Sequence, residues 1–167
     1  MNVVLCGMMG SGKSTVGKAL AKALAWEWTD TDECIIRRNG SITDIFKQKG
    51  EGYFRELEQA LVQALAQKDN LVISTGGGLM LSATNCSLLK EKGKIVYLRA
   101  TKQTLVSRLQ GEKDRPLLQT EEGLDKKIEE LLDERAGIYE SVADFIVDVD
   151  EKTPTQIAQE ILAKIKG

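Results

Sequence analysis

VVLCGMMGSGKST, residues Val3–Thr15, joins a short apolar run to a glycine-rich turn and the start of a helical pattern. From Gly7 to Ser14 the sequence matches G-x-x-x-x-G-K-[ST] at every fixed position. Such glycines allow a turn whose main-chain N–H groups face a phosphate, and the following helix adds its positive end. A glycine-rich turn without a ligand is the alternative, which the strand before it and the helix after it disfavour. The sequence therefore predicts a nucleotide-binding loop, here called the phosphate loop (Gly7–Ser14).

Two side chains of the phosphate loop have predicted roles in phosphate and metal binding. The ammonium group of Lys13 can reach the β- and γ-phosphates of a nucleotide, and the hydroxyl of Ser14 can bind Mg²⁺. The guanine-reading N-K-x-D pattern is absent from the sequence, which argues against a GTPase. The run Phe145–Glu151 imitates the acidic motif of motor ATPases, but it lies in the last predicted strand. A small-molecule kinase is the class that remains.

Apolar runs and helical spacings alternate along the rest of the chain. Runs that predict buried strands are Asn2–Cys6, Trp26–Thr29, Leu71–Ser74, Ile95–Leu98 and Phe145–Val149. Predicted helices include Ser14–Leu24, Ile42–Phe46, Phe54–Leu65, Thr101–Leu109, Leu124–Tyr139 and Thr153–Lys166. Alternation of this kind predicts an α/β fold of three layers, a five-stranded parallel sheet with helices on both faces. At roughly 150 residues per domain, the chain is expected to form one domain over residues 1–167.

A polar, charged segment without apolar periodicity interrupts this pattern between Gln110 and Glu122. Its length approaches the limit for a loop inside a compact domain, and such loops are often functional. We therefore expect residues 110–122 to form a mobile lid.

The composition excludes several classes of site. The 167 residues include no histidine, so Ser–His–Asp systems, imidazole bases and histidine metal sites are absent. Three widely separated cysteines, Cys6, Cys34 and Cys86, favour neither a disulfide framework nor a zinc site. The net charge of −2 and the scattered Lys and Arg residues predict neither a nucleic-acid nor a membrane partner. With no apolar run near about 18 residues and no signal-peptide pattern, we expect a cytosolic protein, and a monomer.

Acidic residues and glycines follow two of the predicted strands. Asp30 and Asp32 follow the second strand, at the edge where ligands bind in such sheets. They are either helix-capping acids or groups that bind a metal and orient an attacking hydroxyl. Gly76–Gly78 follows the third strand and is either a tight turn or a place where backbone approaches a ligand closely.

Three arginines are individually uninformative but together suit an acidic substrate. Arg55 has an alternative role in a pair with Glu58, while Arg115 and Arg135 are equally compatible with solvated positions. Guanidinium groups can hold a carboxylate through two hydrogen bonds, and one on a mobile loop can neutralise a transferring phosphate.

With these residues in place, the sequence resembles the shikimate kinase family over essentially the whole chain. The features that carry the resemblance are Gly7–Thr15, Asp30–Asp32, Ile42–Phe46, Gly50-Glu51 with Phe54-Arg55 and Glu58, Gly76–Gly78, Arg115–Leu118, and Glu134-Arg135 with Tyr139. The resemblance implies a P-loop kinase with a closing lid. It also implies transfer of the ATP γ-phosphate to the 3-hydroxyl of shikimate, on the route to chorismate and the aromatic amino acids.

Matching positions carry the family's site onto this sequence. ATP binding is implied for Gly10, Ser11, Gly12, Lys13, Ser14, Thr15, Arg108 and Arg115, with Arg108 stacking on adenine. Arg55 and Arg135 would hold the carboxylate of shikimate, while Asp32 and the segment Gly76, Gly77 and Gly78 would hold its hydroxyls. Asp32 is also the candidate base, and Lys13, Asp32 and Arg115 form the implied catalytic set. Mg²⁺ would be supported by Ser14 and Asp30.

One departure and two alternatives accompany this interpretation. Gly137 stands where the family often has proline, and we expect it to loosen the helix segment that presents Arg135. The first alternative is another kinase of the same architecture, acting on gluconate or a nucleotide. The second is a kinase-like regulator that binds a nucleotide without catalysis, but such proteins tend to lose the chemical residues that this chain retains.

Overall fold

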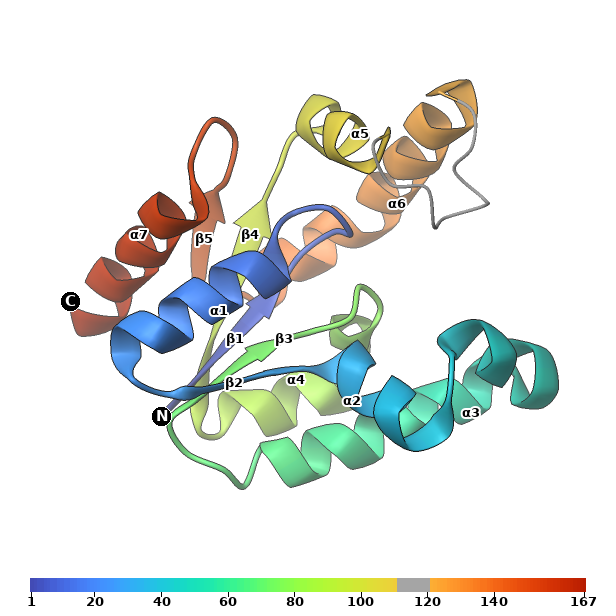
Figure 1. The fold of residues 1–167 in the computed structure, drawn as a ribbon, viewed down its shortest axis with the longest axis horizontal. Helices are drawn as coiled ribbons and strands as arrows, with labels where there is room; N and C mark the ends of the chain where they lie inside the picture. Colours follow the sequence, from blue (N-terminus) through green and yellow to red (C-terminus); the bar gives the residue numbers. More distant parts are fainter. Residues whose placement is uncertain (111–120) are drawn as a thin grey trace.

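Five parallel strands form the centre of the molecule (Figure 1). They are β1 (Asn2–Cys6), β2 (Glu27–Asp30), β3 (Leu71–Ser74), β4 (Gly93–Arg99) and β5 (Phe145–Asp148). Their order across the sheet is β2-β3-β1-β4-β5, so the strand that enters the phosphate loop is the central one. This computed structural model describes residues 1–110 and 121–167. The predicted five-stranded parallel sheet is confirmed.

Helices cover both faces of the sheet, as Figure 1 shows. They are α1 (Lys13–Leu24), α2 (Thr31–Asn39), α3 (Ile42–Leu65), α4 (Ala83–Lys90), α5 (Lys102–Gln110), α6 (Glu121–Val142) and α7 (Pro154–Lys166), with a 3₁₀ turn η1 (Leu79–Leu81). On one face α1 packs against α7, and on the other α3 packs against α4 and α4 against β4. The predicted three-layer arrangement is therefore present in the described residues.

Local sequence signals explain where these elements begin and bend. Each of the five residues of β1 is buried, which a strand covered on both faces requires. The side chain of Asp30 accepts a hydrogen bond from the main chain of Glu33 and caps α2. Thr153 and Gln156 form a reciprocal capping box at the start of α7, where Pro154 occupies the first turn.

One predicted break is confirmed, and two boundaries need correction. Two helices lie on either side of a kink within α3, where Gly50 has a φ of 84° that is not helical, but the first of them runs past Phe46 to this kink. The polar segment is also shorter than expected, because Gln110 ends α5 and residues 121–122 begin α6. The remaining residues of the predicted lid, 111–120, lie outside the described residues, and so does Arg115.

The strand register aligns the residues that follow the strands. Asp30 lies beside Ser74 in the β2–β3 pair, and Ser74 lies beside Leu5 in the β1–β3 pair. The segments after β2, β3 and β1 therefore leave the sheet at the same edge. Within residues 1–110 and 121–167, no helix is long and apolar enough to cross a membrane.

Candidate active site

The phosphate loop is shaped by glycines in conformations that other residues rarely adopt. Gly7, Gly10 and Gly12 have φ values of 147°, 82° and 97°. A Cβ atom on Gly7 would also lie 2.7 Å from the carbonyl oxygen of Leu98. The loop needs glycine for its backbone conformation, which turns main-chain N–H groups toward one point.

Lys13 is partly buried at the start of α1, and its ammonium group lies against the phosphate loop. Its Nζ donates a hydrogen bond to the carbonyl of Gly7 at 2.6 Å. Burial lowers the pKa of Lys13 to about 8, against the opposing effect of the nearby Asp32 and Asp30 carboxylates. An anion placed in the loop would favour the ammonium form, so the site is arranged to gain from binding phosphate.

A chain of hydrogen bonds fixes the first turn of α1 against the sheet. Trp28 Nε1 donates to Ser74 Oγ at 3.0 Å, and Ser74 Oγ donates to the carbonyl of Lys13 at 2.6 Å. Gly17 makes room for this chain, because a Cβ atom there would lie 2.5 Å from Trp28 Nε1 and closer still to Ser74 Oγ. The position of Lys13 therefore depends on a tryptophan and a serine from two neighbouring strands.

Ser14 and Asp30 form an oxygen pair beside Lys13. Ser14 Oγ donates to Asp30 Oδ2 at 2.8 Å, while Asp30 Oδ1 accepts from the main chain of Glu33 at 3.1 Å. The capping role and the ligand role considered for Asp30 thus use different oxygens. A hydroxyl and a carboxylate suit Mg²⁺, which is usually completed by phosphate oxygens and water. No group of three acidic or thiol side chains that could hold a metal occurs in the described parts of the chain.

The glycine turn, Gly76–Gly78, lies directly against three functional candidates. A Cβ atom on Gly76 would overlap Asp32 Oδ1, one on Gly77 would lie 2.9 Å from an Arg135 nitrogen, and one on Gly78 would lie 2.6 Å from two Arg55 nitrogens. None of the three glycines has a positive φ. The turn needs glycine for space, since each position leaves room for one charged side chain.

Thr31 and Tyr139 hold this turn in place. The main-chain N–H of Gly76 donates to Thr31 Oγ1 at 2.8 Å, and the hydroxyl of Tyr139 donates to the carbonyl of Gly77. Burial raises the pKa of Tyr139 to about 12, so the hydroxyl remains a donor at neutral pH. Both ends of the turn are therefore anchored by side chains from other elements, α2 and α6.

Arg55 on α3 is held by two carboxylates. Its NH1 nitrogen lies 2.6 Å from Glu58 Oε1, and its NH2 nitrogen lies 3.2 Å from Glu51 Oε1. Glu58 is only 1% exposed; burial raises its pKa, while Arg55 opposes that shift. The pair with Glu58 proposed from spacing is present, and it holds the guanidinium beside Gly78.

A cavity of about 490 Å³, here called the central cavity, gathers most of the candidate residues. Its lining includes Gly10, Gly12, Lys13, Ser14, Thr15, Asp30, Asp32, Gly76, Gly77, Gly78 and Arg135. The Nε atom of Arg135 is buried without a hydrogen-bond partner among the described residues. Arg55 instead lines an adjoining cavity of about 330 Å³, which shares Gly78 with the central cavity. The structure thus places Arg135 in the lining of the central cavity and Arg55, paired with Glu58, at its border.

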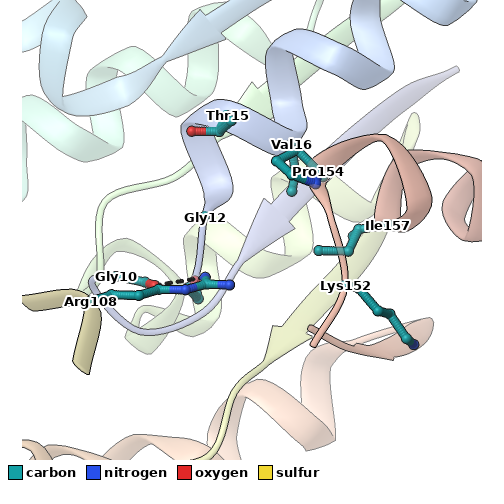
Figure 2. A pocket seen from close by; sticks show the side chains of 9 residues that line it. Gly10, Gly12, Thr15, Val16, Arg108, Lys152, Pro154 and Ile157 are labelled. Carbon is teal, nitrogen blue, oxygen red and sulfur yellow. Dashed lines mark hydrogen bonds between the residues drawn. The ribbon is translucent and has the colours of Figure 1, made fainter. Parts of the chain in front are cut away.

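A second cavity, the Arg108 cavity, lies on the other side of the phosphate loop. It measures about 290 Å³ and is lined by Gly10, Ser11, Gly12, Thr15, Val16, Arg108, Lys152, Pro154 and Ile157. Arg108 donates to the carbonyl of Gly10 at 3.1 Å. Figure 2 shows Arg108 on one side of the cavity and Pro154 with Ile157 on the other. This partly apolar cavity beside the phosphate loop suits a nucleotide base.

Sequence reasoning missed several residues that shape these cavities. Thr31, Ser74 and Trp28 act through hydrogen bonds that depend on strand register, which the sequence pattern does not reveal. Lys152, Pro154 and Ile157 lie far from the phosphate loop in sequence; the family resemblance implies that the region near Pro154 backs the adenine, but it matches too loosely there to name residues. The proline that begins α7, preceded by a capping threonine, was the one signal in the sequence for a rigid wall at this place.

A family model, curated relatives and solved structures of shikimate kinases all match this chain over nearly its whole length. The family model described as shikimate kinase matches residues 9–166. The chain is 46% identical to a shikimate kinase of Sulfurihydrogenibium sp. (strain YO3AOP1) over 166 residues, covering 99% of this chain and 98% of the relative. It is 42% identical to one of Persephonella marina, covering 99% of each. A solved shikimate kinase from Acinetobacter baumannii, in complex with shikimate, is similar with a TM-score of 0.90 and 37% identity, over 99% of this chain and 92% of that chain.

Proposed function

Since the chain belongs to the shikimate kinase family, we propose that it transfers the γ-phosphate of ATP to the 3-hydroxyl of shikimate, giving shikimate 3-phosphate and ADP. One observation carries this proposal. The central cavity joins the phosphate loop directly to Asp32, Arg135 and the glycine turn, so donor and acceptor groups share one space. The reaction would serve the route to chorismate and the aromatic amino acids.

The donor side is formed by the phosphate loop and the Arg108 cavity. Main-chain N–H groups of the loop and the ammonium of Lys13 would hold the β- and γ-phosphates. The base would lie between Arg108 and Pro154, where a cavity of suitable size opens beside the loop. Ser14 and Asp30 would hold Mg²⁺, which supplies positive charge to the phosphates when bound.

The acceptor side is formed by side chains around the glycine turn. Arg135 would bind the carboxylate of shikimate, because its guanidinium lines the central cavity beside Gly77. Arg55 would add a second guanidinium at the border of the cavity, oriented by its hydrogen bond to Glu58. Asp32 and the main chain of Gly76–Gly78 would bind the ring hydroxyls.

The chemistry follows from these positions. Asp32 would accept the proton of the 3-hydroxyl as the oxygen attacks the γ-phosphorus, and the bond to the bridging oxygen of ADP would break. Lys13 would stabilise the charge that develops on the transferring group. Arg115 would act on the same group from residues 111–120, a role that rests on the family resemblance alone. Catalysis here depends on positioning and charge rather than on a covalent intermediate.

The alternatives are separated by the acceptor. Two guanidinium groups with Asp32 suit a ring that bears a carboxylate and neighbouring hydroxyls, whereas gluconate is linear and a nucleotide carries phosphate. A regulator that binds a nucleotide without catalysis would have no need of Asp32 beside the phosphate loop. The cytosolic location and the monomeric state remain predictions.

The test is ADP release measured side by side with shikimate, gluconate and nucleoside monophosphates. We expect turnover with shikimate and none above background with the others. Turnover confined to gluconate or a nucleotide would show that the acceptor is assigned wrongly. Nucleotide binding without turnover on any acceptor would favour the regulator.

A further inference from the structure

The Arg108 cavity is built from segments that are far apart in sequence. One wall is Arg108, on α5. The opposite wall is Lys152, Pro154 and Ile157, from the loop after β5 and the first turns of α7. A base bound between these walls requires the two segments to keep a fixed spacing. Hydrogen bonds that join α5 to the β5–α7 loop would therefore help to maintain this spacing.

Asp150 joins the two segments through hydrogen bonds. Its Oδ1 accepts hydrogen bonds from both the main-chain N–H and the hydroxyl of Thr101, each at 3.2 Å. Thr101 immediately precedes α5, and its hydroxyl also accepts from the main chain of Thr104. A carboxylate at this end of α5 is further favoured by the helix dipole.

The loop that carries Asp150 is itself fixed to its surroundings. Val149 donates through its main chain to the carbonyl of Arg99, and Lys152 pairs with Glu160 of α7 at 2.6 Å. Glu151, between them, has a φ of 60°, which gives the loop its bend. Figure 2 shows the amine of Lys152 directed away from Arg108. These contacts fix the position of the loop, so that Asp150 can position the start of α5.

At the other end of α5, Arg108 donates to the carbonyl of Gly10 in the phosphate loop. The helix is therefore anchored at its start by Asp150 and near its end by the phosphate loop. Because α5 also packs against α6, where Lys102 pairs with Asp125 at 3.4 Å, loss of the first anchor would let the start of α5 shift rather than release the helix. Such a shift moves the two walls relative to each other. The phosphate loop would not move, because its shape comes from its own glycines and from α1.

We propose that Asp150 is a positioning residue that sets the spacing between Arg108 and the Pro154 wall for binding of a nucleobase. The proposal rests on the proposed use of ATP. It concerns the base and not the phosphates, so the two parts of a nucleotide separate its effect from a general loss of structure.

Isothermal titration calorimetry with ADP and with inorganic pyrophosphate, each with Mg²⁺, tests this separation. For Asp150→Ala we expect ADP affinity to fall about three- to tenfold, the size of roughly one net hydrogen bond. Pyrophosphate affinity should stay within about twofold of the wild type. In turnover, KM for ATP should rise while kcat and KM for shikimate are retained. Asp150→Asn keeps the Oδ1 acceptor and should restore ADP affinity.

Asp148→Ala is the matched control. Asp148 lies two residues earlier and binds Arg99 through two hydrogen bonds, at 2.6 and 3.1 Å, without contacting α5 in the described contacts. It should leave ADP affinity unchanged. An equal loss of ADP and pyrophosphate affinity in Asp150→Ala, or no loss of either, would overturn the proposal. A wild-type protein that binds no ADP would instead overturn the proposed function together with it.

Discussion

Two glycine-rich turns face each other across the central cavity, and they use glycine for different reasons. In the phosphate loop, Gly10 and Gly12 have φ values of 82° and 97°, so the residue is needed for its conformation. In the glycine turn, Gly78 has an ordinary φ of −95°, but a Cβ atom would lie 2.6 Å from Arg55. The phosphate loop presents its main-chain N–H groups, whereas the glycine turn leaves room for charged side chains.

The difference shows how each half of the site obtains its specificity. Main-chain N–H groups recognise phosphate, which every nucleotide carries, so the phosphate loop needs few side chains. Recognition of a carboxylate and hydroxyls requires charged side chains in fixed positions, and the glycine turn provides the space for them. Variants of the two turns should therefore fail in different ways.

The largest effect is expected where a side chain does enter the phosphate loop. Lys13→Met should lower kcat by at least about a hundredfold, because the developing charge on the γ-phosphate loses its ammonium. The free energy of unfolding should not fall, since the loop is held by its glycines and the ammonium is buried at a cost. Steady-state turnover and denaturant unfolding measure the two quantities. Near-normal kcat would show that the main chain alone suffices.

The same ammonium predicts a pH dependence in the wild type. The pKa of Lys13 in the free protein is about 8, so the fraction of charged Lys13 falls as the pH rises through that value. Phosphate binding favours the charged form, and ADP affinity should therefore decrease above pH 8. Lys13→Met should lack this decrease in calorimetric titrations from pH 7 to 9, roughly one unit on each side of that pKa.

The next effect tests whether Gly78 serves only to leave room for Arg55. Gly78→Ala should raise KM for shikimate about ten- to a hundredfold, because the guanidinium is displaced from its geometry. KM for ATP should change little. Arg55→Ala should raise KM for shikimate by a similar factor.

A double-mutant cycle tests whether Gly78→Ala raises KM for shikimate by displacing Arg55. In the Arg55→Ala background the added Cβ of Gly78→Ala has no guanidinium to displace, so it should add less than about twofold. If the two effects multiply instead, Gly78 has a role of its own, and the description of the glycine turn as a space for side chains is wrong.

A smaller effect comes from exchanging one glycine of the phosphate loop for two different residues. Gly12→Ala should destabilise the fold by about 1–2 kcal/mol, because alanine is strained at positive φ. Gly12→Asn should cost less, since asparagine tolerates this region better. At Gly78 the order should reverse, with asparagine worse than alanine because it is larger. Denaturant unfolding ranks the two Gly12 variants, and KM for shikimate ranks the two Gly78 variants. If alanine and asparagine ranked in the same order at both positions, glycine would not serve different purposes in the two turns.

The smallest effect concerns a glycine that serves neither purpose. Gly137 lies inside α6, and among the described residues no atom beyond its own stretch of helix lies within 4 Å of the place a Cβ atom would take. Gly137→Ala should therefore stabilise the protein by about 0.5–1 kcal/mol, the difference in helix propensity. Thermal unfolding with unchanged KM for shikimate would confirm it. A loss of stability would show that α6 uses the glycine in a way its contacts do not reveal.

Much of the fold was accessible from sequence because its signals are local. The five strands were predicted within about two residues of their bounds, which is usual for patterns of buried apolar runs. Only the family resemblance grouped Asp32 with Gly76–Gly78 in advance; the structure places β2 beside β3 and these residues in one cavity. Lys13 and Ser14 could be identified because the phosphate-loop motif is defined by residue spacing alone.

What sequence could not provide depends on register and on contacts between distant elements. The hydrogen bond from Trp28 to Ser74 exists only because β2 and β3 pair in one register. The bonds from Thr101 to Asp150 join residues 49 positions apart. The helix-capping and ligand roles of Asp30 were treated as alternatives, but its two oxygens serve separate partners. The sequence could not show that one carboxylate oxygen of Asp30 accepts from Glu33 while the other accepts from Ser14.

The strand order has a consequence for protein engineering. With β1 in the middle, β2 and β3 carry Asp32 and the glycine turn to one side of it, while β4 and β5 lead to Arg108 and Pro154 on the other. A library aimed at a new acceptor can therefore be confined to the β2–β3 half and Arg135, leaving the nucleotide half untouched. A chimera that exchanges the β2–β3 half as a block would also have to carry over Arg135, which α6 presents from the other half.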